Sequence, residues 1–316
     1  MNKRIKKMLL VVLLIFMTLT GCTKTLVDDN KQRVVNENTG QSLTANILCL
    51  PEEEKLSNIY QQYKDKLNVD LDKLSTCADM KVFEKDQYDG LWVQLFVRPL
   101  AWLIINVGKL VKNYGISVMI IGLLIRIILL PFTIKSTKQS EQMKKIQPEL
   151  ERLEKKYAGK DDQDSLMKKS QETMMLYQKY KINPMSSCLI MFVQLPIFFA
   201  FLEAINRTPA IFENYLWQFQ LGTTPLFGIQ HGNYWYIILL VLIIVFTGLT
   251  FLSSMGSMSG SSEQMKQSKM MMIMMMVFIG IASFQLPSAI ALYWVITNAF
   301  SVVQTFIVKK VTKGGK

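Results

Sequence analysis

Long uncharged runs separated by clusters of basic residues dominate this 316-residue chain. Runs near 20 residues recur after residue 113, and a helix of about 20 apolar residues matches the roughly 30 Å hydrocarbon core of a bilayer. Half of the residues are hydrophobic and only 19% are charged, whereas soluble proteins carry about 25% charged residues. A net charge of +12 suits either nucleic acid or a membrane surface. The alternation of basic clusters with apolar runs favours the membrane.

Several classes of catalytic and metal site are missing from the sequence. The chain has one His and four Cys with no Cys-x-x-Cys pair, which argues against a zinc site or a redox motif. It has no Gly-x-Gly-x-x-Gly motif and no Walker loop, and we find no nucleophile with a matching base and acid. We therefore expect no metal, no cofactor, no sequence-specific contact with nucleic acid and no enzymatic activity.

The first 21 residues have the pattern of a bacterial lipoprotein signal peptide. Four basic residues within positions 3–7 precede a short apolar run, which ends in Leu19-Thr-Gly-Cys22. This ending predicts cleavage before Cys22 and a lipid such as palmitate on its thiol. An uncleaved anchor helix is the alternative. If the lipoprotein interpretation holds, the mature chain begins outside the cytoplasm.

Residues 22–89 are predicted to form an external segment of different character. Positions 23–89 carry 13 acidic and 9 basic residues, and we expect a helix around 52–67 after a loose start. Cys49 and Cys77 both lie in this segment. A disulfide between them would close a loop and contribute about 3–4 kcal/mol in an oxidising compartment. Two free thiols are the alternative.

Residues 90–113 are predicted to form an amphipathic helix that lies flat on the outer face of the membrane. Trp92 and Phe96 recur at helical spacing on an apolar side, and Gln94 and Arg98 belong to a basic side. A spanning helix is the alternative, but an Arg-Pro pair at its middle would be costly. It would also place the strongly basic loop after the next span outside the cell, against the positive-inside rule.

Five apolar runs are predicted to span the membrane, so the fold class is an all-α polytopic membrane protein. The predicted spans are 114–134, 184–206, 234–255, 269–286 and 287–308. With an external start, loop 207–233 lies outside. Loops 135–183 and 256–268 and the basic tail 309–316 lie in the cytoplasm. Loop 135–183 carries 12 basic and 8 acidic residues, in agreement with positive-inside topology.

Loop 135–183 is predicted to be an antiparallel helical hairpin. Apolar residues spaced by three and four form a narrow seam before and after a polar turn at 159–164. The seam residues are Met143, Ile146, Leu150, Leu153 and Tyr157 in the first helix and Met167, Met174 and Tyr177 in the second. A solvated charged linker is the alternative.

Arg126 is the principal candidate site residue because it lies deep within a predicted span. It is about 18 Å from the outer end and about 12 Å from the inner end of an uninterrupted helix over 114–134. A charge at this depth indicates a functional site, and snorkelling toward the inner surface is the alternative. Glu203 is the only carboxylate in the five predicted spans, but it is too close to an outer end to pair with Arg126. We therefore expect water to reach Arg126.

Other polar groups in the spans are expected to line the same wet recess. Gln194 lies near the middle of its predicted span, where a hydrogen bond between helices is the alternative role. Trp294 and Asn298 are four residues apart and therefore share one helix face.

Taken in order, these motifs resemble the YidC membrane protein insertase family, in the five-span lipoprotein form of single-membrane bacteria. The resemblance covers about residues 90–308. The matching motifs are Tyr114-Gly-Ile-Ser, Leu-Ile-Arg126-Ile, Gln147-Pro-Glu-Leu, Asn183-Pro-Met, Gln194-Leu-Pro-Ile-Phe and Leu-Tyr293-Trp-Val-Ile-Thr-Asn298. Two departures are Gly122, where many relatives carry a hydroxyl residue, and the longer external segment 23–89.

The resemblance implies a hydrophilic groove, open to the cytoplasm and to lipid but closed to the outside. It places Arg126 in this groove, with Gln194 and Trp294 nearby. It also implies insertion of nascent membrane proteins into lipid, alone or with the Sec translocon, and contact with a ribosome or targeting factor. The main alternative is a small-solute or anion transporter that uses Arg126, but the inverted repeats typical of transporters are not visible. An intramembrane hydrolase would need paired His or Asp residues, which the spans lack.

Overall fold

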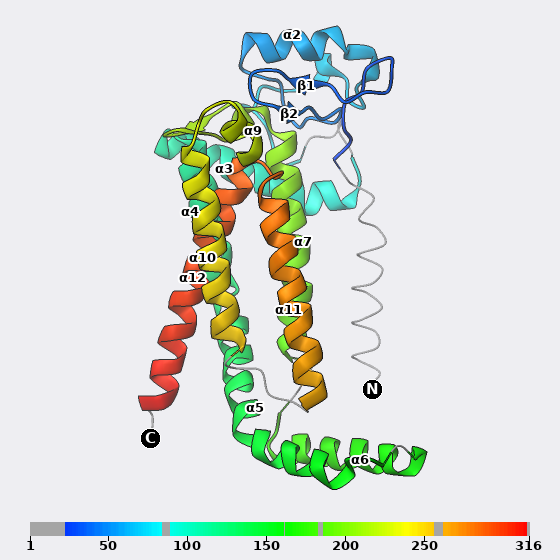
Figure 1. Cartoon of the computed structure of the whole chain (residues 1–316). Coiled ribbons are helices and arrows are strands. Elements are labelled where there is room, and N and C mark those ends of the chain that lie inside the picture. Colours follow the sequence, from blue (N-terminus) through cyan, green and yellow to red (C-terminus); the bar gives the residue numbers. More distant parts are fainter. Residues whose placement is uncertain (1–22, 84–88, 161, 183–185, 256–261, 315–316) are drawn as a thin grey trace. The chain divides into compact units, whose positions relative to one another are not determined.

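The computed structural model describes residues 23–83, 89–160, 162–182, 186–255 and 262–314, and it is mostly helical (Figure 1). The signal peptide and Cys22 lie outside the described residues. The chain divides into two compact units. Unit 1 comprises Met1–Gly122, Gln194–Val241 and Ser283–Trp294, and unit 2 comprises Leu123–Val193, Leu242–Ala282 and Val295–Lys316.

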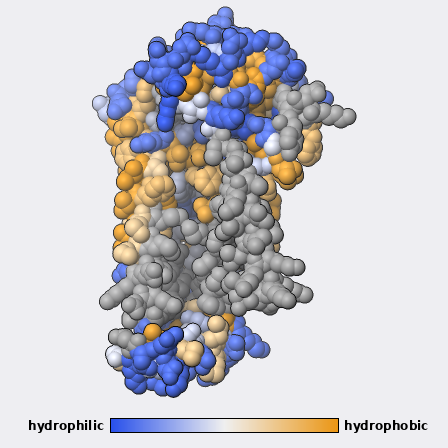
Figure 2. All heavy atoms as spheres, turned by 90° about the vertical axis from the view of Figure 1, so that its right-hand side faces the viewer, coloured by the Kyte–Doolittle hydropathy of each residue, from blue (hydrophilic) through white to orange (hydrophobic). Residues whose placement is uncertain are grey.

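Residues 23–83, here called the N-terminal module, form a folded body within unit 1. Two short strands pair antiparallel, with Val35 opposite Ser42 and Asn36 opposite Gln41. On the face that Figure 2 shows, most of the side chains at the top of the view, where this module lies, are hydrophilic. Its elements are β1 (Val35–Asn36), β2 (Gln41–Ser42), α2 (Glu54–Gln62) and the 3-10 turns η1 (Lys64–Lys66) and η2 (Leu71–Lys73).

Apolar side chains from the whole module share one core. The predicted helix around 52–67 is confirmed by α2, but the prediction of a loose start is wrong. Leu26 and Leu43 are both buried in the core, and the Leu26 amide donates a 2.8 Å hydrogen bond to the Leu43 carbonyl. Cys49 and Cys77 are joined in a disulfide whose two residues are fully buried. The module therefore has its own apolar interior despite its many charges.

Residues 93–111 form a continuous helical stretch that begins with the π-helical turn η3 (Val93–Val97) and continues as α3 (Arg98–Val111). The predicted orientation of its faces is wrong in part. Gln94 and Arg98, which we expected on an exposed basic side, are 9% and 1% exposed. Apolar Leu103 and Leu110 are 41% and 82% exposed. The buried side therefore combines these two polar residues with apolar ones such as Leu100 and Ile104, and other apolar side chains are left exposed.

The first predicted span is broken where the sequence suggested one uninterrupted helix over 114–134. α4 (Tyr114–Ile128) ends before α5 (Leu130–Tyr157) begins, and the helices Tyr114–Ile128 and Leu130–Met143 are bent by 56°. Pro131 explains the break, because it has no amide hydrogen for the Ile127 carbonyl and its ring crowds that carbonyl. By length and composition, α4 and the first part of α5 qualify as a membrane span only when they are taken together as one bent span.

α5 and α6 (Gln163–Lys179) run antiparallel within unit 2. Lys156 Nζ lies 2.7 Å from Glu172 Oε1, and the Tyr180 hydroxyl donates to Glu149, so the pairing runs in opposite directions along the two helices. Their seam core contains Ile146, Leu150, Tyr177 and Ile182, with Met143 and Leu176 packed against it. The predicted seam residues Met167 and Met174 are instead 57% and 56% exposed.

The remaining elements follow α7 (Ser186–Arg207), which covers the predicted span 184–206. Strands β3 and β4 pair antiparallel, with Tyr215 opposite Gln220. The predicted cytoplasmic loop 256–268 is partly helical, because α11 begins at Ser262. The elements are α8 (Pro209–Phe212), β3 (Tyr215–Leu216), β4 (Phe219–Gln220), α9 (Pro225–Gln230), α10 (Trp235–Met255), α11 (Ser262–Ser283) and α12 (Ser288–Gly314).

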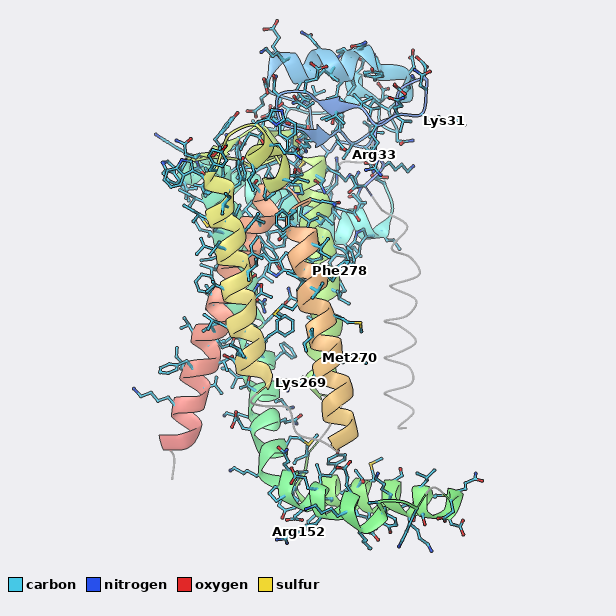
Figure 3. The ribbon with its side chains drawn as sticks, viewed as in Figure 1. Lys31, Arg33, Arg152, Lys269, Met270 and Phe278 are labelled. Carbon is cyan, nitrogen blue, oxygen red and sulfur yellow. A yellow bond between two sulfur atoms is a disulfide. The ribbon has the colours of Figure 1, made fainter. Side chains whose placement is uncertain are left out.

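Several of these helices could cross a membrane by length and composition. Among the described residues three pass this test, Val93–Val111, Trp235–Ser253 and Ser288–Val308, and the bent pair α4–α5 would add a fourth. Met270 and Phe278 on α11 are 59% and 69% exposed (Figure 3). Exposed apolar side chains of this kind suit contact with lipid.

Candidate functional site

Arg126 lies in the last turn of α4, two residues before the helix ends. Its side chain is half-buried, and the neighbouring Ile127 and Ile128 are 51% and 70% exposed. α4 ends at Ile128 and not at residue 134, and α5 begins at Leu130, so Arg126 lies next to the bend between the two helices.

Gln194 connects α7 to α12 within unit 1. Its Nε2 donates a 3.2 Å hydrogen bond to the Tyr293 hydroxyl. Tyr293 is buried, and its ring stacks on Phe201 with the ring centroids 4.2 Å apart. Gln194 therefore has the interhelical role that the sequence left open as an alternative.

Trp294 lies beside this pair on α12. Its ring is half-buried and packs at a tilt against Phe198 of α7, with the centroids 5.5 Å apart. The structure therefore brings Gln194 and Trp294 onto the facing surfaces of two neighbouring helices in unit 1. This α7–α12 surface combines an amide, a phenol and an indole with apolar rings.

Asn298 and Arg126 belong to unit 2. Asn298 is 8% exposed, and its backbone carbonyl accepts a 3.4 Å hydrogen bond from the Thr250 hydroxyl of α10. Further along α12, Gln304 Nε2 donates a 2.5 Å hydrogen bond to the Thr133 hydroxyl of α5. Polar side chains therefore join α12 to two other helices of unit 2.

A buried ionic cluster at the C-terminal end of α7 was not predicted. Arg207 and Glu203 are 1% and 7% exposed, and Arg207 Nη1 lies 3.4 Å from Glu203 Oε2. Arg207 also forms an ion pair with Asp89, and Trp92 Nε1 donates a 2.9 Å hydrogen bond to Glu203. The spacing of four between Glu203 and Arg207 was the one available signal in the sequence. Their pairing with Asp89 and Trp92 required the tertiary fold.

The helical hairpin carries a second group of charged contacts. Hydrogen bonds from Lys156 and Tyr157 lower the pKa of Glu172 below its usual range. An open cavity of about 700 Å³ lies between the two helices. Its lining combines both signs of charge with apolar groups and consists of Glu149, Arg152, Leu153, Lys156, Glu172, Met175, Leu176 and Lys179.

Comparison with known proteins identifies close relatives over most of the chain. Residues 106–315 match the family model described as 60Kd inner membrane protein. The membrane protein insertase YidC of Oceanobacillus iheyensis is 38% identical over 239 residues, which are 75% of this chain and 91% of that protein. The membrane protein insertase MisCA of Bacillus subtilis is 36% identical over 238 residues, which are 75% of this chain and 86% of that protein.

A solved active YidC insertase, whose first transmembrane domain is resolved, shares 25% sequence identity with a TM-score of 0.47. The alignment covers 69% of this chain and 47% of that one, so the present chain spans about half its length. The family match and the apolar helices indicate a multi-pass protein of the cell membrane. Because the family model covers more than half of the chain and the relatives exceed 30% identity, this chain belongs to the YidC family of membrane protein insertases.

Proposed function

We propose that this protein inserts nascent membrane proteins by passing their short polar tails through a water-filled groove and releasing their apolar segments into lipid. The observation that carries the proposal is the relationship to named membrane protein insertases over 239 residues. A half-buried arginine in an otherwise apolar helix supports it. The proposed groove residues are Arg126, Gln194, Trp294 and Asn298. The homologues give no support to the alternative of an anion transporter.

The mechanism follows from the cost of moving polar groups through hydrocarbon. Each unsatisfied polar group of a translocated tail costs several kcal/mol in an apolar medium. A wet groove that reaches part of the way across shortens this barrier, and the positive charge of Arg126 attracts acidic residues of the incoming tail. The apolar segment then partitions into lipid, which supplies the driving force. No covalent step, ATP or cofactor is needed.

The proposed topology has five spans, the N-terminus outside and the C-terminus in the cytoplasm. The charge of the loops supports it, because loop 135–183 has an excess of four basic residues. In this arrangement η3 and α3 lie at the outer surface, and the α5–α6 hairpin projects into the cytoplasm. The hairpin is then placed to meet a ribosome, a targeting factor or the Sec translocon.

Crosslinking to a stalled nascent membrane protein tests the insertase function. Photoreactive residues at positions 126, 194 and 294 should crosslink the translocated or apolar segment of the substrate. A probe at the exposed position 110 of α3 serves as the control, since it lies on a different helix. Equal crosslinking at positions 110 and 194, or none at the three groove positions, would contradict the proposed route.

The lipid anchor at Cys22 has a separate test. The Leu-x-Gly-Cys motif predicts that Cys22→Ala blocks both lipid attachment and signal-peptide cleavage, while insertion by the spans is retained. Incorporation of a labelled fatty acid and the mobility of the product measure both steps. Lipid incorporated into the variant would show that the assignment is wrong.

A further inference from the structure

The N-terminal module and the segment that follows α7 share one hydrophobic core. Phe212 of α8 is 2% exposed and belongs to the module's core together with Leu43, Ile47 and Tyr60. Gly40 lies against Phe227 of α9 so closely that an added Cβ would be 2.1 Å from the ring. Residues 207–233, which the sequence predicted as a plain external loop, are therefore part of the module's fold.

Arg207 joins the module to the end of α7. Its Nε donates a 2.7 Å hydrogen bond to the Asn46 carbonyl of the module, in addition to its ion pairs with Glu203 and Asp89. The Arg207 carbonyl accepts a 2.7 Å hydrogen bond from the Leu48 amide. The buried Arg207 guanidinium therefore contacts three chain segments, which contain Asn46, Asp89 and Glu203.

Two further contacts reinforce this junction. The Thr44 hydroxyl donates to the Asn206 carbonyl at 3.2 Å. The Glu213 carboxylate accepts hydrogen bonds from the amides of Glu52 and Glu53, at 3.1 and 3.2 Å, where α2 begins. These contacts pair polar groups of the module with polar groups of residues 206–213.

The same segment holds the beginning of α12. The Ser288 and Ala289 amides donate to the carbonyls of Thr223 and Leu221, at 2.9 and 3.0 Å. These are N-terminal helix amides, which have no partner within their own helix. Leu221 is itself fully buried. The segment between α7 and α10 thus accepts hydrogen bonds from the first turn of α12, while the module holds the end of α7.

We propose that the N-terminal module, together with residues 207–233 packed against it, is a structural cap that fixes the C-terminal end of α7 and the beginning of α12 and excludes external water from the α7–α12 surface. Arg207 is its positioning residue. Gln194 is 207 − 194 = 13 residues from Arg207 on α7, about 20 Å along the helix, and Trp294 is about 9 Å from Ser288 on α12. Of the two helices that carry proposed groove residues in unit 1, α7 ends at this cap and α12 begins there. The role of the cap in insertion rests on the proposed function. The exclusion of external water, here called the seal, does not.

The cap assigns a structural role to residues 23–83, which precede the region that matches the family model, residues 106–315. Removing one partner of a buried ion cluster leaves an uncompensated charge, which is more damaging than losing an exposed ion pair. Loss of the Arg207 guanidinium should therefore loosen this junction more than loss of any exposed charge of the module.

The seal is tested by thiol labelling of a residue beneath the cap. Ala289→Cys is introduced with Cys188→Ser, and a membrane-impermeant maleimide is added to intact cells. Ala289 is fully buried, so the parent should react slowly. Arg207→Ala should raise the labelling rate about 100-fold, as expected when a buried ion pair loses one partner. Thr44→Val, which removes the hydrogen bond to the Asn206 carbonyl, should raise the labelling rate less. This second variant keeps the test valid if Arg207→Ala does not fold.

Arg33→Ala is the matched control, because it removes the same charge from an exposed position of the same module (Figure 3). It should label at the parent rate. Equal labelling rates in Arg207→Ala, Thr44→Val and Arg33→Ala would show that the module does not act as a cap.

Insertion of a model substrate, measured per folded molecule, should fall in Arg207→Ala and not in Arg33→Ala. Faster labelling with unchanged insertion would overturn the positioning role. If the parent itself inserts no substrate, the proposed function fails, and the labelling comparison still decides whether the cap exists.

Discussion

Two arginines of this chain occupy different electrostatic environments. Arg207 is 1% exposed and is surrounded by two carboxylates and a backbone carbonyl. Arg126 is half-buried in the last turn of a helix whose neighbouring side chains are apolar. The first arrangement suits a structural role, because burial is compensated by specific partners. The proposed role of Arg126 depends on its positive charge within an apolar helix.

Charge at position 126 should matter more than the shape of the guanidinium. If Arg126 attracts acidic tails, Arg126→Lys should keep much of the insertion activity, because an ammonium also attracts carboxylates. Arg126→Ala should fail most with acidic tails, and Arg126→Glu should be worse. The measurement is insertion of two substrates that differ only in tail acidity, at equal protein levels. Equal losses for acidic and neutral tails would rule out the attraction.

Glu213 should make the stability of unit 1 depend on pH. Burial, with a smaller contribution from the nearby Glu52 and Glu53 carboxylates, raises the pKa of Glu213, and the hydrogen bonds from the two backbone amides oppose this increase. The folded state therefore favours the protonated carboxyl group. This contribution to stability is complete below the usual pKa of about 4.3 and is lost as pH rises through the folded pKa.

Glu213→Gln should accordingly reduce the fall in Tm between about pH 4 and pH 7, because glutamine does not ionise. Thermal unfolding in detergent at several pH values measures this difference. Glu37→Gln, at an exposed position, is the control and should keep the parent's pH dependence. Identical profiles for both variants and the parent would show that Glu213 does not contribute.

At the scale of elements, α3 and α5 both have an apolar face by sequence pattern. The burial of their side chains shows that the two helices use these faces differently. α3 buries Arg98 and leaves Leu110 exposed, whereas α5 buries Ile146 and exposes its charges. The first pattern suits an element with lipid on one side, and the second suits an element with water on one side. The two helices therefore belong to different surroundings within one chain.

The α5–α6 hairpin should depend on its small apolar seam. Leu150 is 3% exposed between the helices, so Leu150→Ala should destabilise the hairpin by about 2–4 kcal/mol. Leu166→Ala, at a position that is 53% exposed, should change stability by less than about 0.5 kcal/mol. Hydrogen exchange of the α5 and α6 amides in the full chain measures both effects. Equal exchange rates in the two variants would mean that the seam does not stabilise the hairpin.

At the scale of the whole molecule, the distribution of charge predicts which ends of the helices face the cytoplasm. Single cysteines at positions 160 and 310, in a chain that lacks Cys188, should react with an impermeant maleimide only after the cells are opened. A cysteine at exposed position 230 should react in intact cells. Reaction of position 160 from outside would reverse the proposed topology.

The sequence alone determined the membrane character, the helical hairpin and the family resemblance, because these depend on local composition, periodicity and the order of motifs. It also marked Arg126 as a candidate, since a charge within an apolar run is visible without a fold. The break at Leu129 was missed, although Pro131 marks it in the sequence. Such a signal predicts a weakened helix but not whether the helix bends.

Only the tertiary structure decided the roles of residues whose partners are distant in the chain. Arg207 meets Asn46 and Asp89 across more than 100 residues, and Phe212 completes a core that begins at Leu26. The burial of Gln94 and Arg98 likewise depends on what packs against α3. Periodicity shows which residues share a face, but the environment of that face is set by long-range packing, which local sequence does not encode.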